Sequence, residues 1–183
     1  MTGTATEATV RERAEAMLNR DLTCQSLGIA LDEVAPGRAV LTMRLAPDMV
    51  NGHGIAHGGW LFLLADAAFA YACNSHGPAA VAQTAQVTFL RPAGPGDELV
   101  AEAVERARSG RTGLYDVTVR RPEDGAVIAE FRGHSVMMSG RPAASPAVPA
   151  AQTAQTAQTA PAAPAAPTDT ARPTTPGPPP AGS

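Results

Sequence analysis

The pattern of apolar and polar positions predicts an antiparallel sheet that carries one long helix. Apolar and polar side chains alternate over Ala39–Leu45 and Thr112–Arg121, the period of a strand with one buried face. Trp60–Cys73 is rich in Leu and Ala and predicts a helix. Further elements are expected as strands at Ile29–Val34, Val81–Leu90, Glu98–Arg106 and Val127–Met138, and as a first helix at Glu7–Arg20. The expected order is helix, two strands, long helix and four meandering strands, an α+β fold of about six strands.

The long helix is apolar on nearly every side, which is more surface than one face of a sheet covers. In so small a domain we expect a second copy of the chain to cover the rest. The run is too short to span a membrane and contains a charged residue, so no membrane partner is expected.

The composition changes at Gly140. Residues 140–183 consist almost entirely of Ala, Pro, Thr, Gln, Gly and Ser and include a short AQT repeat. Such a segment buries too little apolar surface to offset the entropy of ordering it, so it is predicted to be a disordered tail. Residues 1–139 are then one domain of ordinary size.

Charge and cysteine content narrow the possible functions. The formal net charge of −3 at pH 7 is not typical of a nucleic-acid-binding protein, so no nucleic-acid partner is expected. All fourteen basic residues are arginine, which excludes chemistry that needs a lysine. The two cysteines have no metal-binding spacing, and the N-terminus carries charge where a signal peptide has its apolar core. A cytoplasmic protein is expected.

Asp66 is the one charged residue in the predicted buried helix. Burying an unpaired carboxylate is costly, so a structural role requires a partner from elsewhere, such as an arginine on a strand. The catalytic alternative is a general base, because desolvation raises the pKa of a carboxyl group and makes it a stronger base. The residues alone leave both interpretations open.

Gly58 and Gly59 begin the same helix, directly after His57. The first N–H groups of a helix have no partners within it, so they are candidate donors to an oxyanion, although two glycines also suit a plain loop-to-helix turn. Asp66 lies eight residues beyond Gly58, about 12 Å along the helix axis. If both act on one carbonyl group, they are expected to come from different chains.

His53 and His57 are four residues apart, which on a helix is a metal-binding spacing. They flank a glycine-rich loop and have no obvious third ligand, so no metal is predicted and hydrogen bonding that shapes the loop is expected instead. Cys73 is expected to be a buried apolar residue rather than a nucleophile.

Four strings together resemble the PaaI-type thioesterases of phenylacetate degradation, which have the hotdog fold: NGHGIAHGGWLFLLADAAFAYACNS, FLRP, GRTGLYDV and FRGHS. The resemblance runs from about Arg11 to Met138. It implies a long central helix wrapped by an antiparallel sheet, and homodimers that pair into tetramers. It also implies hydrolysis of aryl- or arylacetyl-CoA, such as phenylacetyl-CoA or hydroxyphenylacetyl-CoA, to the free acid and CoA without a cofactor.

By motif position, the resemblance makes Asp66 the catalytic carboxylate and Gly58 the oxyanion donor. Asn51 is expected to position the carbonyl or the water, and His57 and Gly59 are expected to contact the substrate. A threonine that related arylthioesterases place one turn after the carboxylate is absent here. The resemblance does not decide whether the carboxylate acts as a base or as a nucleophile.

Acyl-CoA as substrate requires cationic contacts for the CoA phosphates, which arginine provides well. Arg91, Arg108 and Arg111 lie at predicted strand ends or turns, and Arg108 and Arg111 are the expected contacts. Two rival functions share the fold: a hydratase or dehydratase, and a non-catalytic acyl-CoA-binding protein. Release of a thiol distinguishes the thioesterase from both.

Overall fold

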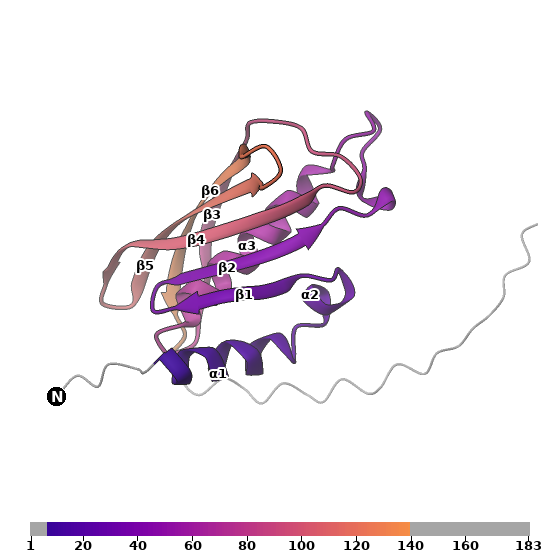
Figure 1. The fold of residues 1–183 in the computed structure, drawn as a ribbon. Helices are drawn as coiled ribbons and strands as arrows, with labels where there is room; N and C mark the ends of the chain where they lie inside the picture. The colour runs from indigo at the N-terminus through magenta and orange to yellow at the C-terminus, as the bar shows by residue number, and fades with distance from the viewer. Residues whose placement is uncertain (1–6, 140–183) are drawn as a thin grey trace, which may run out of the picture. The chain divides into compact units, whose positions relative to one another are not determined.

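The computed structural model describes residues 7–139, so the predicted tail lies outside the described residues. Six strands form one antiparallel sheet in the order β1-β2-β4-β5-β6-β3 (Figure 1). Their bounds are β1 Ala30–Ala35, β2 Arg38–Arg44, β3 Ala80–Phe89, β4 Glu98–Ser109, β5 Thr112–Arg121 and β6 Ala126–Met137. The predicted α+β class, with a helix on an antiparallel sheet, is confirmed.

The helices are α1 (Glu7–Leu18), α2 (Leu22–Ser26) and α3 (Gly58–Asn74), with a 3-10 turn at Pro47–Met49. The long helix α3 lies across one face of the sheet, and α1 packs beside β1 (Figure 1). The sequence pattern missed α2, which is only five residues long and is capped by the Asp21 carboxylate. One helical turn is too short to show an apolar period.

The sequence predicted that the last four strands form a meander, and this prediction is wrong for β3. β4, β5 and β6 are sequential neighbours, but β3 pairs with β6 and not with β4. Because α3 connects β2 to β3, the chain crosses the sheet and β3 joins its far edge, where Val87 lies opposite Phe131. β4 then returns to pair with β2.

The core lies between α3 and the inner face of the sheet. Every second residue of the central strands faces α3, including Ala101, Ala103, Val117, Val119 and Phe131, and all five are buried. These residues pack against the buried side of α3, which includes Leu61, Leu64, Ala65, Ala68 and Phe69. This alternation is the period of two seen in the sequence.

One side of the molecule stays uncovered in the single chain. β3 is an edge strand whose residues are mostly exposed, including Val81 at 47% and Phe89 at 51%. The opposite edge strand, β1, has α1 beside it. A half-buried stripe of α3 adjoins the uncovered side and comprises Phe62, Leu63, Asp66, Ala67 and Ala70. One chain therefore does not bury α3 on every side.

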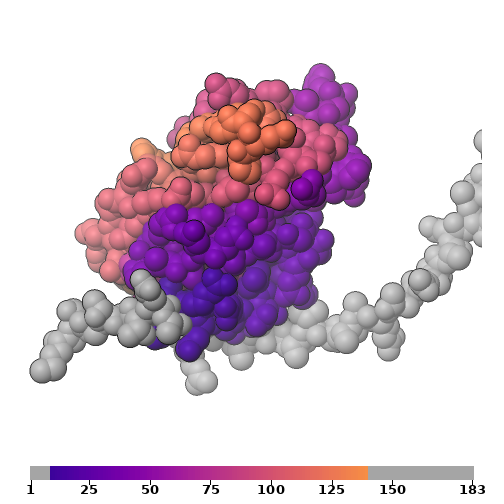
Figure 2. All heavy atoms as spheres, in the orientation of Figure 1, coloured from indigo at the N-terminus to yellow at the C-terminus, as the bar shows by residue number. Residues whose placement is uncertain are grey.

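Figure 2 shows the sheet face that points away from α3, with the segment between β2 and α3 projecting from one end of the molecule. This segment contains the 3-10 turn and the glycine-rich loop. Within residues 7–139, no helix combines the length and the apolar character needed to cross a membrane.

Candidate active site

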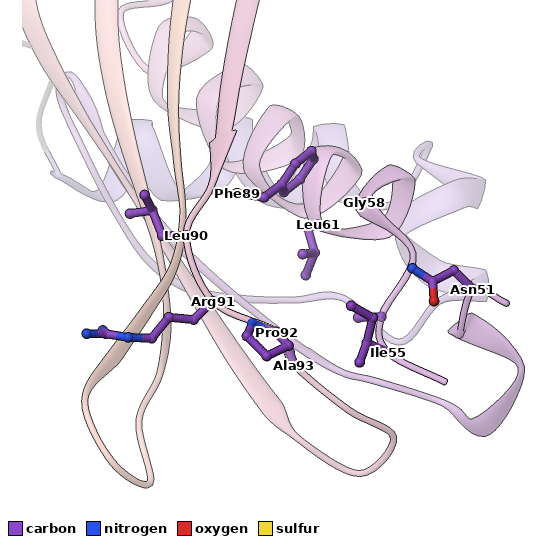
Figure 3. Close-up of a pocket in the computed structure, with 10 residues that line it drawn as sticks. Asn51, Ile55, Gly58, Leu61, Phe89, Leu90, Arg91, Pro92 and Ala93 are labelled. Atoms are coloured by element: carbon purple, nitrogen blue, oxygen red, sulfur yellow. The ribbon is translucent and has the colours of Figure 1, made fainter. Parts of the chain in front are cut away.

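A pocket of about 470 Å³ opens at the N-terminal end of α3 (Figure 3). Two stretches of chain form it, the loop before α3 and the segment after β3. They are joined by a hydrogen bond of 2.8 Å from the Ala56 N–H to the Ala93 carbonyl. The lining residues are Asn51, Ile55, Ala56, Gly58, Leu61, Phe89, Leu90, Arg91, Pro92 and Ala93. Most of this wall is apolar, which suits an apolar ligand held by a few polar groups.

Gly58 is the first residue of α3 and lines the pocket. Its backbone N–H has no acceptor within residues 7–139. The positive end of the helix dipole adds to this donor, so negative charge is favoured here. The structure thus offers one free backbone donor at an apolar pocket, which is the geometry of an oxyanion donor.

His57 caps α3. Its Nδ1 accepts a hydrogen bond of 3.0 Å from the Gly59 N–H, and its carbonyl accepts one of 2.9 Å from the Trp60 N–H. The ring therefore carries no proton on Nδ1, and its remaining nitrogen, Nε2, holds the proton when the ring is neutral. The Gly59 N–H is therefore paired with the His57 ring, and the Gly58 N–H remains as the free donor. His57 and Gly59 were both predicted to contact substrate, and neither lines the pocket.

Asn51 lies in the loop opposite Gly58 and lines the same pocket. Its Oδ1 accepts a hydrogen bond of 2.8 Å from the His53 N–H. This bond orients the side-chain amide, because only the oxygen can face a backbone donor. The Nδ2 group has no acceptor among the described residues and is available as a donor. Of the two roles left open for Asn51, donation to a carbonyl oxygen fits this orientation directly.

Phe89 covers Gly58 from the end of β3. A Cβ built on Gly58 would lie only 2.9 Å from Cζ of the Phe89 ring. A residue with a side chain at position 58 would therefore collide with this ring or displace it. A side chain at position 58 thus requires the Phe89 ring to shift, although the helix conformation itself accepts any residue there.

Asp66 lies half-buried near the middle of α3 and does not line the pocket. Burial alone raises the pKa of its carboxyl group above the ordinary value of 3.8. The Asp66 carboxylate has no hydrogen bond or ion pair within the described part of the chain. Residues 7–139 thus supply no arginine or other partner of the kind that a structural role for Asp66 requires. The Asp66 side chain lies instead on the half-buried stripe of α3.

The other arginine candidates lie elsewhere. Arg108 Nε is 4.0 Å from a carboxylate oxygen of Glu105, and Arg111 donates to the Met137 carbonyl. Both belong to the β4–β5 hairpin and line no part of the Gly58 pocket. Arg91, by contrast, lies on the rim of that pocket.

Of the pocket wall from Phe89 to Ala93, only Arg91 was named from the sequence, although the FLRP string, Phe89 to Pro92, was part of the resemblance. Cys73 is buried, and burial raises the pKa of its thiol to about 12. Residues 7–139 contain no cluster of three His, Cys, Asp or Glu side chains that could hold a metal ion.

Comparison with known proteins identifies the family of the chain. The model of the thioesterase superfamily matches residues 53–128. The acyl-coenzyme A thioesterase PaaI of Escherichia coli is 45% identical over 129 residues, which are 70% of this chain and 91% of that protein.

Solved structures give the same result. The Escherichia coli PaaI protein from the phenylacetic acid degradation operon aligns with a TM-score of 0.70 and 44% identity, over 72% of this chain and 94% of that one. A variant of the phenylacetic acid degradation protein PaaI from Thermus thermophilus aligns with a TM-score of 0.62 and 40% identity, over 64% of this chain and all of the other. The chain therefore belongs to the thioesterase superfamily, as a hotdog-fold thioester hydrolase of the PaaI type.

Proposed function

We propose that this protein hydrolyses arylacetyl-CoA thioesters, such as phenylacetyl-CoA or hydroxyphenylacetyl-CoA, to the free acid and CoA. The observation that carries the proposal is the pair of unpartnered donors, Gly58 N–H and Asn51 Nδ2, at one apolar pocket. Two donors can hold the oxygen of a thioester carbonyl as negative charge develops on it. The acyl-CoA and phenylacetate connections of the PaaI relatives support the choice of substrate.

The catalytic carboxylate in this proposal is Asp66 of a second copy of the chain. Eight residues of helix separate Gly58 from Asp66 of the same copy, about 12 Å of rise, which is too far for both to reach one carbonyl group. The uncovered edge of β3 and the half-buried stripe of α3 supply the surface for pairing two copies. Pairing through β3 lays two α3 helices side by side and brings the middle of one towards the N-terminal half of the other. We extend the proposal to a dimer of such dimers.

In the proposed reaction, Gly58 and Asn51 donate hydrogen bonds to the carbonyl oxygen of the thioester. The partner's Asp66 removes a proton from water, whose oxygen bonds to the carbonyl carbon. The tetrahedral intermediate collapses, the C–S bond breaks, and the CoA thiolate leaves and takes up a proton. Burial favours this role because a carboxylate with a raised pKa is a stronger base.

The alternative is direct attack of Asp66 on the carbonyl carbon to give a mixed anhydride. A single turnover in ¹⁸O-water distinguishes the two routes. With a general base, the product acid carries ¹⁸O. With an anhydride that opens at the aspartyl carbon, the ¹⁸O stays on Asp66, where mass spectrometry of the peptide detects it.

Thiol release from a panel of arylacetyl, benzoyl and linear acyl-CoA thioesters tests the proposed substrate. We expect the highest kcat/KM for phenylacetyl-CoA and its ring-hydroxylated forms. A preference for linear acyl chains would contradict the arylacetyl assignment. Binding of acyl-CoA without thiol release would contradict the enzymatic role itself.

Mixing two inactive variants tests the shared site. Gly58→Ala and Asp66→Asn each disable one half of a site, so a mixed dimer contains one site with both halves intact. We expect part of the activity to return after the two proteins exchange subunits. If no activity returns although subunit exchange is proven, both residues belong to a site within one chain, and the proposal of a shared site is contradicted.

A further inference from the structure

Arg91 is the one charged side chain among the residues that line the Gly58 pocket. The remaining lining residues are apolar or neutral, and no carboxylate is among them. The pocket therefore presents a single positive charge, which favours a ligand with negative charge in that region.

The guanidinium of Arg91 is also free. It has no hydrogen bond or ion pair within the described residues. In contrast, Arg121 is held by Asp97 and Asp124, and Arg132 by Asp116. Five N–H donors of a guanidinium without an acceptor are available for a phosphate, which they bind in a bidentate geometry.

The backbone holds Arg91 in place. The N–H groups of Leu90 and Arg91 both donate to the Ile128 carbonyl, at 2.8 and 3.3 Å, and Pro92 restricts the backbone of Arg91, the residue before it. Figure 3 shows the Arg91 side chain pointing away from Asn51 and Gly58, on the far side of Pro92. Arg91 thus lies at the end of the pocket lining opposite Asn51 and Gly58, with its side chain directed outward from the rim.

We propose that Arg91 binds the phosphate groups of the CoA moiety. The inference rests on the proposed function, in which the thioester carbonyl binds at Gly58 and Asn51. From there the substrate extends in two directions, and only the CoA side ends in phosphates, since an arylacetyl group carries no charge. Arg91 therefore replaces Arg108 and Arg111 as the expected phosphate contact of this pocket.

The test compares two thioesters that share the same reacting group. Phenylacetyl-CoA carries the phosphates, and the phenylacetyl thioester of N-acetylcysteamine does not. For Arg91→Gln we expect KM for phenylacetyl-CoA to rise roughly 10- to 100-fold, the usual range for a lost charge-assisted hydrogen bond. kcat for this substrate, and kcat/KM for the truncated one, are expected to stay within about twofold of the parent values, because the reacting groups are untouched.

Arg20→Gln is the matched control, because Arg20 is also exposed and unpaired but lines no described pocket. It should change neither constant. Raising the salt concentration should weaken phenylacetyl-CoA binding to the parent protein more than to Arg91→Gln.

Three outcomes would overturn the inference: equal losses on both thioesters, no loss on either, or a phosphate-dependent loss in Arg108→Gln instead of Arg91→Gln. If the parent protein cleaves neither thioester, the proposed function fails by itself. Calorimetric titration with CoA then still decides the role of Arg91. Binding that Arg91→Gln weakens supports it, and absent or unchanged binding overturns it.

Discussion

Asp66 on α3 and Glu105 on β4 are both partly buried carboxylates, but they differ in their hydrogen-bond partners. Glu105 accepts hydrogen bonds from Tyr115 Oη at 2.8 Å and His76 Nε2 at 2.6 Å. Asp66 has no such partner in the described chain. Burial raises the pKa of both groups. For Glu105, however, the hydrogen bonds outweigh burial, and its pKa lies below the ordinary value.

The two ends of α3 repeat this contrast. At the C-terminal end, Asn74 bonds to the Ala70 and Ala80 carbonyls and to the Ala80 N–H, and Ser75 Oγ bonds to the Ala72 carbonyl and the Gly37 N–H. At the N-terminal end, Gly58 leaves its donor free. The polar side chains at the C-terminal end of α3 are therefore paired within the fold, whereas the donor at the N-terminal end is left for a substrate.

The largest effect is expected from Asp66→Asn. Loss of the general base should lower kcat/KM by about 10²- to 10⁴-fold in a thiol-release assay. The same change removes a buried charge, so the free energy of unfolding at pH 7 should rise by about 0.5–2 kcal/mol in a denaturant titration. Unchanged thiol release would remove Asp66 from the active site, and a fall in stability would show that the charge has a partner in the assembled protein.

Next in size is Gly58→Ala, because the new Cβ meets the Phe89 ring at 2.9 Å and disturbs the free donor. We expect kcat to fall by about 10²- to 10³-fold. Gly59→Ala is the matched control, since its Cβ first meets the His57 ring at 3.2 Å, and it should retain most activity. Adding Phe89→Leu to Gly58→Ala separates the collision with the ring from any direct effect of the new methyl group beside the N–H donor. Recovery of activity in this double variant assigns the effect to the collision.

A smaller effect, on stability alone, is expected from Glu105→Gln. The change weakens the hydrogen bonds from Tyr115 and His76 and should lower the free energy of unfolding by about 1–3 kcal/mol, with kcat/KM retained. Glu102→Gln is the control, because Glu102 pairs with Arg38 on the surface and should contribute less than about 1 kcal/mol. A loss of kcat/KM in folded Glu105→Gln would contradict the division between the two regions.

The smallest effects are expected in the pH dependence of the same variants. The raised pKa of Asp66 means that the folded protein gains stability as pH falls towards 3.8, so the advantage of Asp66→Asn should shrink on acidification. The lowered pKa of Glu105 means the opposite, since its contribution is present above pH 4.5 and is lost as pH falls below it. Denaturant titrations across this range measure both. Parallel changes in the two variants would show that the carboxylates share one environment.

The decline of kcat/KM at acidic pH measures the ionisation of Asp66 independently of the stability experiments. As the pH falls, kcat/KM should decline at a higher pH than for a catalytic aspartate of ordinary pKa, because only the ionised form of Asp66 accepts a proton.

Local patterns were sufficient for the strands, for the two longer helices and for part of the site. The alternation in β2 and β5, the apolar run of α3 and the glycines before it are properties of neighbouring residues, so the sequence shows them directly. Asp66 also stood out by itself, as a charge in an apolar helix. What the pattern could not show is that β3 pairs with β6, because strand order depends on contacts between distant segments.

The sequence by itself thus determined the fold class, the long helix and the chemical type of Asp66 and Gly58. Tertiary structure decided which groups share the pocket: it brings Phe89 against Gly58, orients the amide of Asn51 through His53, and places Arg91 on the rim while Arg108 and Arg111 lie elsewhere. The physical reason is that residue type and spacing specify local conformation and chemistry. Whether a donor stays free or becomes paired depends on what the rest of the chain packs around it.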